Sequence, residues 1–357
     1  MRKTLLLIGL FTLLLCACQK ERTIILSGDI DAESTITLAD SAYERKDYET
    51  ALYYYLQLEE YYNLRGSGTK DQAILYNTIG RCYHSFNDIE MEKKYFEKSA
   101  EVCEKLGYDE LNFDNYWYLA SLYNDMNPEN SDRALEFGKK SEQAAERFFG
   151  KNSSEAGETY ARQGEIYLER KEYEKAEEYF QKSLEIMKKI YGEESDELAQ
   201  VFIYQGKLYK DMEKYEDSIS YFKKAEMIFK NRQNAFKLGQ VYYNIADVYL
   251  EEEEYEKSVE YCDMCINLYK EQNINNTDLA ACHYEKAAAA FRLGNNQLFE
   301  EELIKAHKVC EQQSEKSKLA KDMIDLIKKQ FSMYYDEYYA KNDNNGFEAW
   351  YQELIAD

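Results

Sequence analysis

Apolar side chains recur along most of this chain in a pattern that predicts pairs of amphipathic helices. In residues 160–183, Gly164 is followed at fixed offsets by Tyr167, Tyr173, Ala176, Phe180 and Ser183. In each half of this segment the apolar positions fall at i, i+3, i+4 and i+7, which is the spacing of one helix face. The segment therefore predicts a helical hairpin whose two apolar faces meet.

The same frame occurs seven times along the chain. Its first small residue is Ala39, Gly80, Ala120, Gly164, Gly206, Ala246 and Ala287 in turn, with spacings of 41, 40, 44, 42, 40 and 41 residues. The third copy is stretched, because its second small residue, Ala134, comes two positions late, near Pro128. A constant period is the signature of a solenoid, in which stacked hairpins cover one another's apolar faces.

Each position of the frame has a physical role. The small residues allow the two helices of a hairpin to cross closely, and the aromatic residues fill the space between hairpins. Glycines recur where the second helices should end, at Gly66, Gly107, Gly150 and Gly192, because glycine takes the left-handed cap conformation easily. Ser154, Ser195 and Thr277 are expected to cap the helices that follow them.

On these residues the chain resembles tetratricopeptide-repeat (TPR) proteins over residues 31–312. It departs from the family standard of about 34 residues per repeat, and its repeats of 40–42 residues resemble those of kinesin light chains and of bacterial peptide-sensing repeat proteins. The resemblance implies an all-α, right-handed superhelical solenoid of about seven hairpins over residues 32–312. It also implies that the first helices line a concave groove that binds ligands.

Residues 313–357 are helical in pattern but do not fit the frame. They predict an irregular C-terminal helical cap in which Trp350 and Leu354 cover the open end of the stack. A solenoid needs such a cap, because its last hairpin has no following neighbour.

The first seventeen residues predict a signal peptide. Arg2 and Lys3 precede an apolar run from Leu5 to Leu15, which is too short for a membrane span of about 20 residues. The run ends in Leu-Cys-Ala-Cys at Cys18, which resembles the bacterial lipobox, and the resemblance implies a palmitate-bearing diacylglycerol on Cys18. Residues 18–31 would then be the lipidated N-terminus and a tether. An ordinary cleaved signal is the alternative.

The resemblance to bacterial lipoproteins implies a location in the cell envelope, on the exported side of a membrane and anchored by lipid. Gln19 follows the lipid site, where an aspartate would be the usual inner-membrane retention signal in enterobacteria. Its absence favours the outer membrane if the organism has two membranes.

Charge narrows the range of partners. The formal net charge is −23, and removing residues 1–17 makes it −25. Such a surface repels the phosphate backbone of nucleic acids and anionic lipid headgroups. We therefore expect no nucleic-acid partner, and membrane contact only through the lipid anchor.

Motifs that carry chemistry are missing from the sequence. It contains no HExxH, GxSxG, GxGxxG or GxxxxGK[ST], and its three histidines, His84, His283 and His307, lie far apart and are expected at the surface or in the groove. We predict no enzyme activity, no catalytic residues, no cofactor and no metal.

Cys262 and Cys265 fall at core positions of the sixth repeat and are interpreted as small packing residues. A redox or metal pair, together with Cys282, is the alternative, although zinc would need four ligands. Whether these three, Cys82, Cys103 and Cys310 form disulfides stays open.

The resemblance implies that ligands bind along the first helices. The candidate groove residues are Arg81, His84, Trp117, Asn124, Lys207, Tyr243, Tyr284 and Phe291. An exposed Trp117 would be a binding hot spot, whereas aromatic residues that pack between hairpins would not be available to a ligand. The leading hypothesis is a membrane-anchored interaction scaffold or adaptor that binds partner proteins or peptides. The alternative is a sensory module for a signal peptide, although no kinase or DNA-binding segment is attached.

Overall fold

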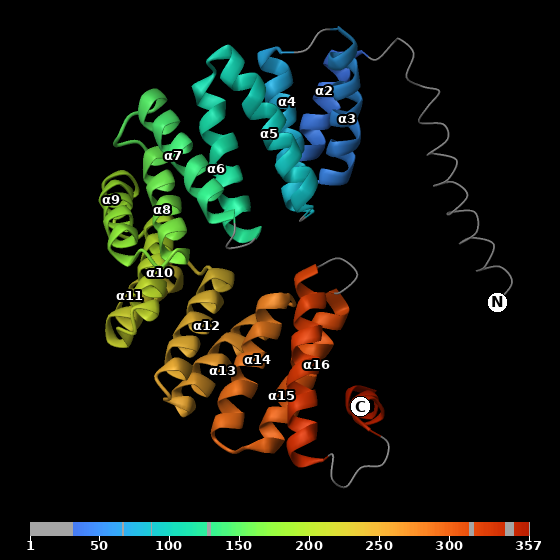
Figure 1. Ribbon diagram of the computed structural model, residues 1–357, viewed down its shortest axis with the longest axis vertical. Coiled ribbons are helices and arrows are strands. Elements are labelled where there is room, and N and C mark those ends of the chain that lie inside the picture. The colour runs from blue at the N-terminus through green and yellow to red at the C-terminus, as the bar shows by residue number, and fades with distance from the viewer. Residues whose placement is uncertain are drawn as a thin grey trace, which may run out of the picture. The chain divides into compact units, whose positions relative to one another are not determined.

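The computed structural model describes residues 31–65, 68–86, 88–126, 130–313, 318–339 and 346–356. Within these ranges every regular element is a helix, as the repeat pattern predicted (Figure 1). None of the helices in these ranges is long and apolar enough to cross a membrane. The expected signal peptide, Cys18 and Gly66 lie outside the described residues.

The described residues divide into two compact units, the first ending at Gly107 and the second beginning at Tyr108. The first unit contains α2 (Ala32–Glu44), α3 (Tyr48–Arg65), α4 (Lys70–Ser85) and α5 (Ile89–Leu106). The second contains α6 (Asp109–Met126), α7 (Ser131–Phe148), α8 (Ser154–Glu169), α9 (Tyr173–Tyr191), α10 (Asp196–Asp211), α11 (Tyr215–Asn231), α12 (Ala235–Glu251), α13 (Tyr255–Glu271), α14 (Thr277–Arg292), α15 (Asn296–Gln313), α16 (Lys318–Tyr338) and α17 (Phe347–Ala356).

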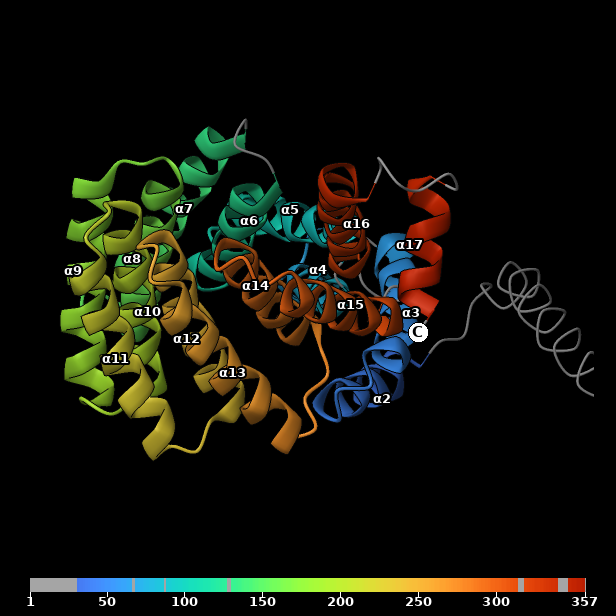
Figure 2. The same cartoon turned by 90° about the horizontal axis from the view of Figure 1, so that it is seen from below.

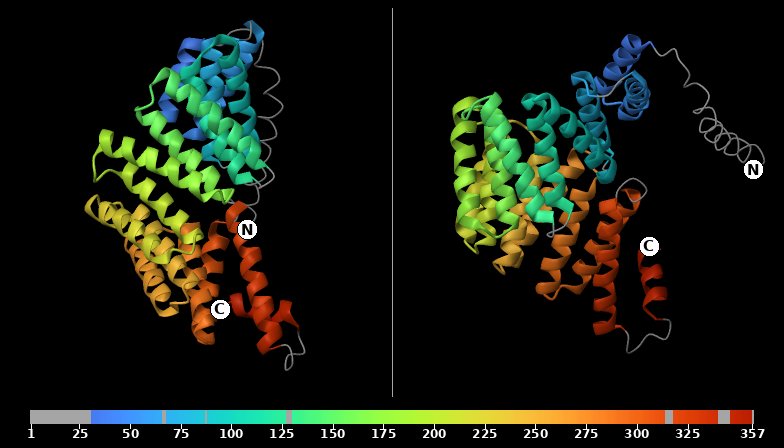
Figure 3. Two further views of the ribbon diagram at one scale, coloured as in Figure 1. Left: turned by 60° about the vertical axis from the view of Figure 1, so that its left-hand side comes forward. Right: turned by 45° about the horizontal axis from the view of Figure 1, so that its top comes forward.

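Helices pair into the expected hairpins, α2–α3 and α4–α5 in the first unit and α6–α7 to α14–α15 in the second. Within each unit the second helix of a hairpin packs against the first helix of the next. Figure 3 shows the helices of the second unit following one another in this order. In Figures 1 and 2, α9 and α11 lie on the outer side of α8 and α10.

The small residues of the frame lie at close helix crossings. A Cβ atom at Gly164 would lie 2.5 Å from the ring of Phe180, and one at Gly206 would lie 2.6 Å from Phe222. The second small residue of a repeat meets the first helix as well, since the Ser218 hydroxyl donates a hydrogen bond of 2.7 Å to the carbonyl of Gly206. The prediction that small residues allow the two helices of a hairpin to cross closely is therefore confirmed.

Glycines with positive φ angles form the turns after the second helices. Gly107, Gly150 and Gly192 have positive φ angles of 64°, 97° and 88° after the second helices. Ser195 caps α10 by accepting a hydrogen bond from the amide of Leu198. The other two cap predictions were wrong by one position, because the residues with extended backbone before α8 and α14 are Ser153 and Asn276. In both places two neighbouring side chains could serve as the cap, and only the backbone conformation distinguishes them.

Stacked tyrosine pairs explain much of the tyrosine content. Tyr167 stacks on Tyr179 with ring centroids 5.4 Å apart, and Tyr209 stacks on Tyr221 at 5.2 Å. The Tyr209 hydroxyl also donates a 2.6 Å hydrogen bond to Glu177. These pairs join the two helices of one hairpin at the same position of successive repeats.

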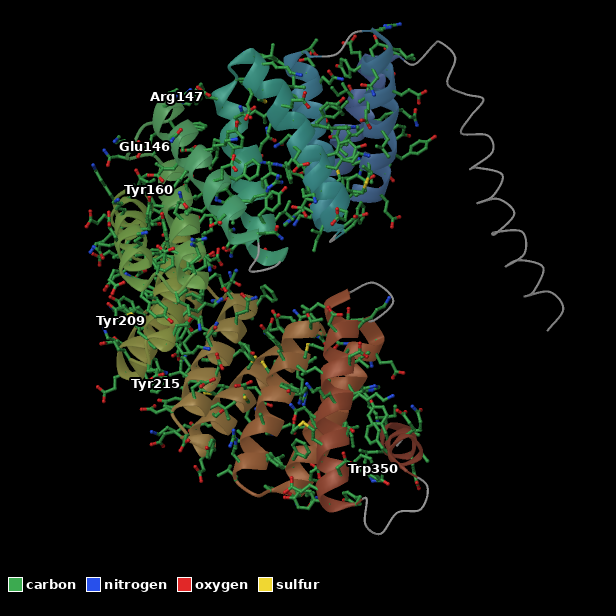
Figure 4. All side chains as sticks on the ribbon, viewed as in Figure 1. Glu146, Arg147, Tyr160, Tyr209, Tyr215 and Trp350 are labelled. Carbon is green, nitrogen blue, oxygen red and sulfur yellow. The ribbon has the colours of Figure 1, made fainter. Side chains whose placement is uncertain are left out.

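Helices α16 and α17 cover the last hairpin. Phe331 and Tyr351 are buried in one apolar cluster with Phe299 of α15. Trp350 lies between α16 and α17 (Figure 4), with its ring centroid 5.9 Å from that of Phe331, and Leu354 packs against the same cluster. The end of the stack is thus closed by side chains that do not follow the repeat frame.

Candidate functional site

The first helices of the hairpins in the second unit line three hollows. The first, of about 120 Å³, is lined by Trp117, Glu158, Ala161, Arg162, Met187, Glu197, Gln200, Val201 and Tyr204. The second, of about 380 Å³, is lined by Glu165, Gln200, Ile203, Tyr204, Lys207, Lys237, Gln240, Tyr243, Asn244, Asp278 and Ala281. Because the two share Gln200 and Tyr204, they adjoin one another.

The third hollow, of about 390 Å³, lies where α14, α15 and α16 meet. Its lining is mostly apolar: Tyr284, Ala288, Phe291, Arg292, Phe299, Leu303, Gln330, Met333, Tyr334 and Glu337. Phe291 is 37% exposed and Met333 is 60% exposed. This hollow has the chemistry to accept an apolar side chain. Sequence reasoning missed the contribution of α16, because that helix does not fit the repeat frame.

The structure brings five of the predicted groove residues to these hollows. Trp117 lines the first, Lys207 and Tyr243 line the second, and Tyr284 and Phe291 line the third. Asn124 is half-buried on α6 and lines none of the three. Arg81 and His84 lie on α4 of the first unit, half-buried and exposed respectively, and line none of the three hollows.

Trp117 lies between the two alternatives that the sequence left open, an exposed hot spot and an aromatic residue packed between hairpins. The guanidinium of Arg162 lies over its ring, 4.6 Å from the centroid, and Arg162 also forms an ion pair with Glu165. The ring packs beside the buried Phe113 and Ala144 as well. The indole Nε1 of Trp117 is nevertheless buried without a hydrogen-bond acceptor. Trp117 is therefore half-buried, and a ligand would meet Arg162 together with the indole edge.

The second hollow is polar and carries side-chain amides. Gln240 donates to Asp278 at 3.1 Å, Lys237 contacts Gln200 at 3.4 Å, and Asn244 donates to the carbonyl of Gln240 at 2.7 Å. A side-chain amide offers both donors and an acceptor, which is what the backbone of an extended peptide requires. These residues hold one another in place and retain further hydrogen-bonding capacity.

An ion pair crosses from α10 to α12 beside Tyr243. Nζ of Lys210 lies 2.5 Å from Oδ2 of Asp247. Burial lowers the pKa of Lys210, but the charge and hydrogen bond of Asp247, together with the charges of Asp211 and Glu251, outweigh burial, so that the pKa is raised overall. Burial also raises the pKa of the half-buried Tyr243, and the carboxylates of Glu285 and Asp247 raise it further.

Glu285 is a buried acid of α14 that sequence reasoning missed, although it lines none of the three hollows. Its side chain is 7% exposed, and its Oε1 has no hydrogen-bond partner. Burial, followed by the charge of Asp247, raises the pKa of Glu285 to about 7. One sequence signal could have pointed to it, because Glu285 stands two residues before the small residue of its repeat, where the hollow-lining Arg162, Tyr204 and Asn244 stand in theirs.

The cysteines of repeats six and seven lie in the core. Cys262, Cys265 and Cys282 are free thiols with no exposed surface. Burial raises the pKa of the Cys262 thiol, which disfavours the thiolate that metals and disulfide exchange require. In the described ranges no group of three or more His, Cys, Asp or Glu side chains is arranged to hold a metal. The three cysteines pack as small core residues.

The surface or groove location expected for the histidines is wrong for two of them. His283 and His307 are buried, and Nδ1 of His283 lies 2.5 Å from Oε2 of the buried Glu302. His84 is exposed and contacts the buried Glu92 at 2.9 Å. His283 and His84 thus each join the two helices of a hairpin.

Comparison with known families agrees with this geometry. One model described as tetratricopeptide repeat matches residues 114–189 and 155–231, and a second such model matches residues 73–106 and 239–272. The chain therefore contains tetratricopeptide repeats. No curated protein matches the chain in sequence.

Solved structures share the fold at low sequence identity. The apo form of RapI is 16% identical with a TM-score of 0.63, covering 79% of this chain and 100% of that one. A tetratricopeptide repeat protein from Parabacteroides merdae is 14% identical with a TM-score of 0.58, covering 83% and 98%. A signal transduction ATPase with numerous domains from Pyrococcus horikoshii, which has a tetratricopeptide repeat sensor, is 22% identical with a TM-score of 0.56, covering 78% of this chain. This chain spans 41% of the Pyrococcus protein.

Proposed function

We propose that the chain is a protein–protein interaction scaffold that holds an extended segment of a partner along the first helices of its second unit. The observation that carries the proposal is the set of three hollows along these helices, two of which adjoin. Amides in the second hollow suit a peptide backbone, and the aromatic third hollow suits an apolar anchor residue. Tetratricopeptide repeats in general imply protein partners, and the fold is typically non-catalytic.

Membrane anchoring belongs to the same proposal and rests on sequence. The lipobox-like ending at Cys18 supports lipid attachment there, and the basic and apolar segments before it support export. Two acyl chains give stable anchoring where one gives only marginal binding. The scaffold would then work on the exported side of a bacterial membrane, at the outer membrane in a cell with two membranes.

A sensory module that binds a signal peptide is the second candidate. One observation favours it: the similar Pyrococcus protein carries a tetratricopeptide repeat sensor. A sensor must change conformation when the peptide binds, whereas an adaptor can hold its partner without a change. Small-angle X-ray scattering with and without a bound peptide separates the two.

Site-specific photocrosslinking tests the scaffold proposal. A photoreactive amino acid would replace Lys207, which is exposed and lines the second hollow, or Glu178, which is exposed on the second helix α9. We expect partner adducts from position 207 and none from position 178 when the protein is irradiated in membranes. Adducts from position 178 alone would place binding on the outer helices and contradict the proposal.

A further inference from the structure

A row of acidic side chains follows the last turns of four successive first helices. Its members are Asp125, Glu169, Asp211 and Glu251 of α6, α8, α10 and α12, which are 44, 42 and 40 residues apart. Each stands five residues after the small residue of its repeat, and all four side chains are exposed. Their charges act on one another, since burial and nearby carboxylates that include Asp211 and Asp125 raise the pKa of Glu169.

The acidic row lies at helix C-termini, where carboxylates are unfavourable. The C-terminal end of a helix carries a partial negative charge, so a carboxylate in the last turn is destabilising and a lysine or arginine would be stabilising. Helices α8 and α12 have no basic residue in the last turn. In the described part of the chain, Glu169, Asp211 and Glu251 form no ion pair. Carboxylates that recur at positions where they destabilise the helix indicate that these residues serve binding and not stability.

Glu285 is an independent sign that a cation belongs in this region. Its carboxyl is more than nine-tenths buried, and one oxygen has no hydrogen-bond partner. The charges that act on it come from Asp247, then Lys210, then Glu251, which is the last member of the acidic row. Lys210 is already paired with Asp247. A buried carboxyl without its own partner is costly unless a donor or a cation reaches it.

We propose that the partner segment is a basic extended peptide, with lysine or arginine at every third position facing the acidic row and a further cation directed at Glu285. The proposal rests on the scaffold function above and names the chemistry of its partner. Packed helices lie about 10 Å apart. An extended chain in the polyproline II conformation has three residues per turn and rises about 3.1 Å per residue, so every third side chain faces the same side and advances by about one helix spacing.

Synthetic peptides test the spacing. Fluorescein-labelled peptides of about fifteen residues would carry five lysines at every third position (four for the row and one for Glu285), five consecutive lysines, or five aspartates at every third position. Binding is measured by fluorescence anisotropy at low and high salt. We expect the spaced basic peptide to bind about tenfold more tightly than the block isomer, because each exposed ion pair contributes about two- to threefold. High salt should remove most of this difference.

Two matched triple variants test the acidic row. E169Q/D211N/E251Q removes three charges of the row, and E174Q/E216Q/E256Q removes three exposed charges with the same sequence spacing from the first turns of α9, α11 and α13. We expect the row variant to bind the spaced peptide about tenfold more weakly and to melt at or above the wild-type temperature. The control variant should bind the spaced peptide normally. It should melt at a lower temperature than wild type, because the carboxylates that it loses stabilise the N-termini of their helices.

Glu285→Gln tests the buried carboxyl. The groups that face Glu285 are Asp247, Glu251 and Lys210, with the Tyr243 hydroxyl and the Cys262 thiol beside it. Because burial raises the pKa of Glu285 to about 7, wild-type affinity for the spaced peptide should rise severalfold from pH 6 to pH 8. The Glu285→Gln variant should show a flat profile over this range.

Several results would overturn the basic-peptide proposal. Equal binding of spaced and block peptides, tighter binding of a helical peptide with lysines at every seventh position, or equal losses in the two triple variants would each do so. Preferred binding of the acidic peptide, crosslinked at position 207, would overturn it while leaving the scaffold function intact. If no partner or peptide crosslinks at position 207, the scaffold proposal itself fails.

Discussion

Replacing Gly164 with alanine tests the helix crossing that defines each repeat. The added Cβ would lie 2.5 Å from Cδ1 and Cε1 of Phe180, a distance that real Cβ atoms do not adopt. Phe180 is fully buried and stacks on Tyr204 of the next hairpin, with centroids 5.6 Å apart, so its ring has little room to move. The helices must separate or Phe180 must leave its position.

Two opposing contributions determine how much Gly164→Ala changes the free energy of unfolding. Overpacking a core costs about 1–3 kcal/mol, whereas alanine in place of glycine in a helix stabilises by about 1 kcal/mol. We therefore expect Gly164→Ala to lower the free energy of unfolding by about 1 kcal/mol. Gly80→Ala is the matched control, because its Cβ would lie 3.1 Å from Phe96, which a small shift relieves. Its effect should be close to zero.

Urea unfolding followed by circular dichroism measures the two variants, and hydrogen exchange locates the damage. Because neighbouring hairpins stabilise one another, protection should fall first in α8–α11. Combining Gly164→Ala with Phe180→Leu should recover part of the lost stability. If Gly164→Ala is as stable as wild type and its exchange is unchanged between residues 158 and 225, the close crossing is not what maintains the repeat.

Three further outcomes are expected. Although burial alone would raise the pKa of Glu302, hydrogen bonds from His283 and Lys305 lower it to about 2. The stability that this depressed pKa provides is therefore complete above about pH 4.5 and is lost as the pH falls towards 2. Glu302→Gln should lose about 3 kcal/mol in urea unfolding at pH 7 and much less at pH 2.5, and an equal loss at both pH values would contradict this. Cys18→Ala should abolish labelling by a palmitate analogue, so labelling equal to wild type would exclude Cys18 as the lipid site. Phe291→Ala should weaken partner capture about tenfold with an unchanged melting temperature, and normal capture would remove the third hollow from the site.

The hairpins could be predicted from sequence because the interactions that form them are short in range. The crossing of Gly164 with Phe180 joins residues sixteen positions apart, and the same pair recurs as Gly206 and Phe222. A repeated unit allows weak signals to reinforce one another. Where the repetition stops, at α16 and α17, the sequence predicted helices but not the third hollow that α16 helps to line.

The candidate site could be predicted only in part. The repeat offsets placed Lys207, Tyr243, Tyr284 and Phe291 at hollows, because the same offset faces the same side in every repeat. The offsets did not show that Arg162 covers Trp117. They also did not single out Glu285, since the position it occupies holds Arg162, Tyr204 and Asn244 in other repeats.

Sequence alone determined the helices, their pairing and the face that each helix presents, because periodicity and close crossings act within one repeat. The tertiary structure decided which side chains from different repeats meet and how deeply they are buried. Lys210 pairs with Asp247 across 37 residues, and the charges that act on the buried Glu285 of α14 come from Asp247, Lys210 and Glu251 of α10 and α12. Burial and charge neighbours depend on how hairpins stack, and no single repeat contains that information.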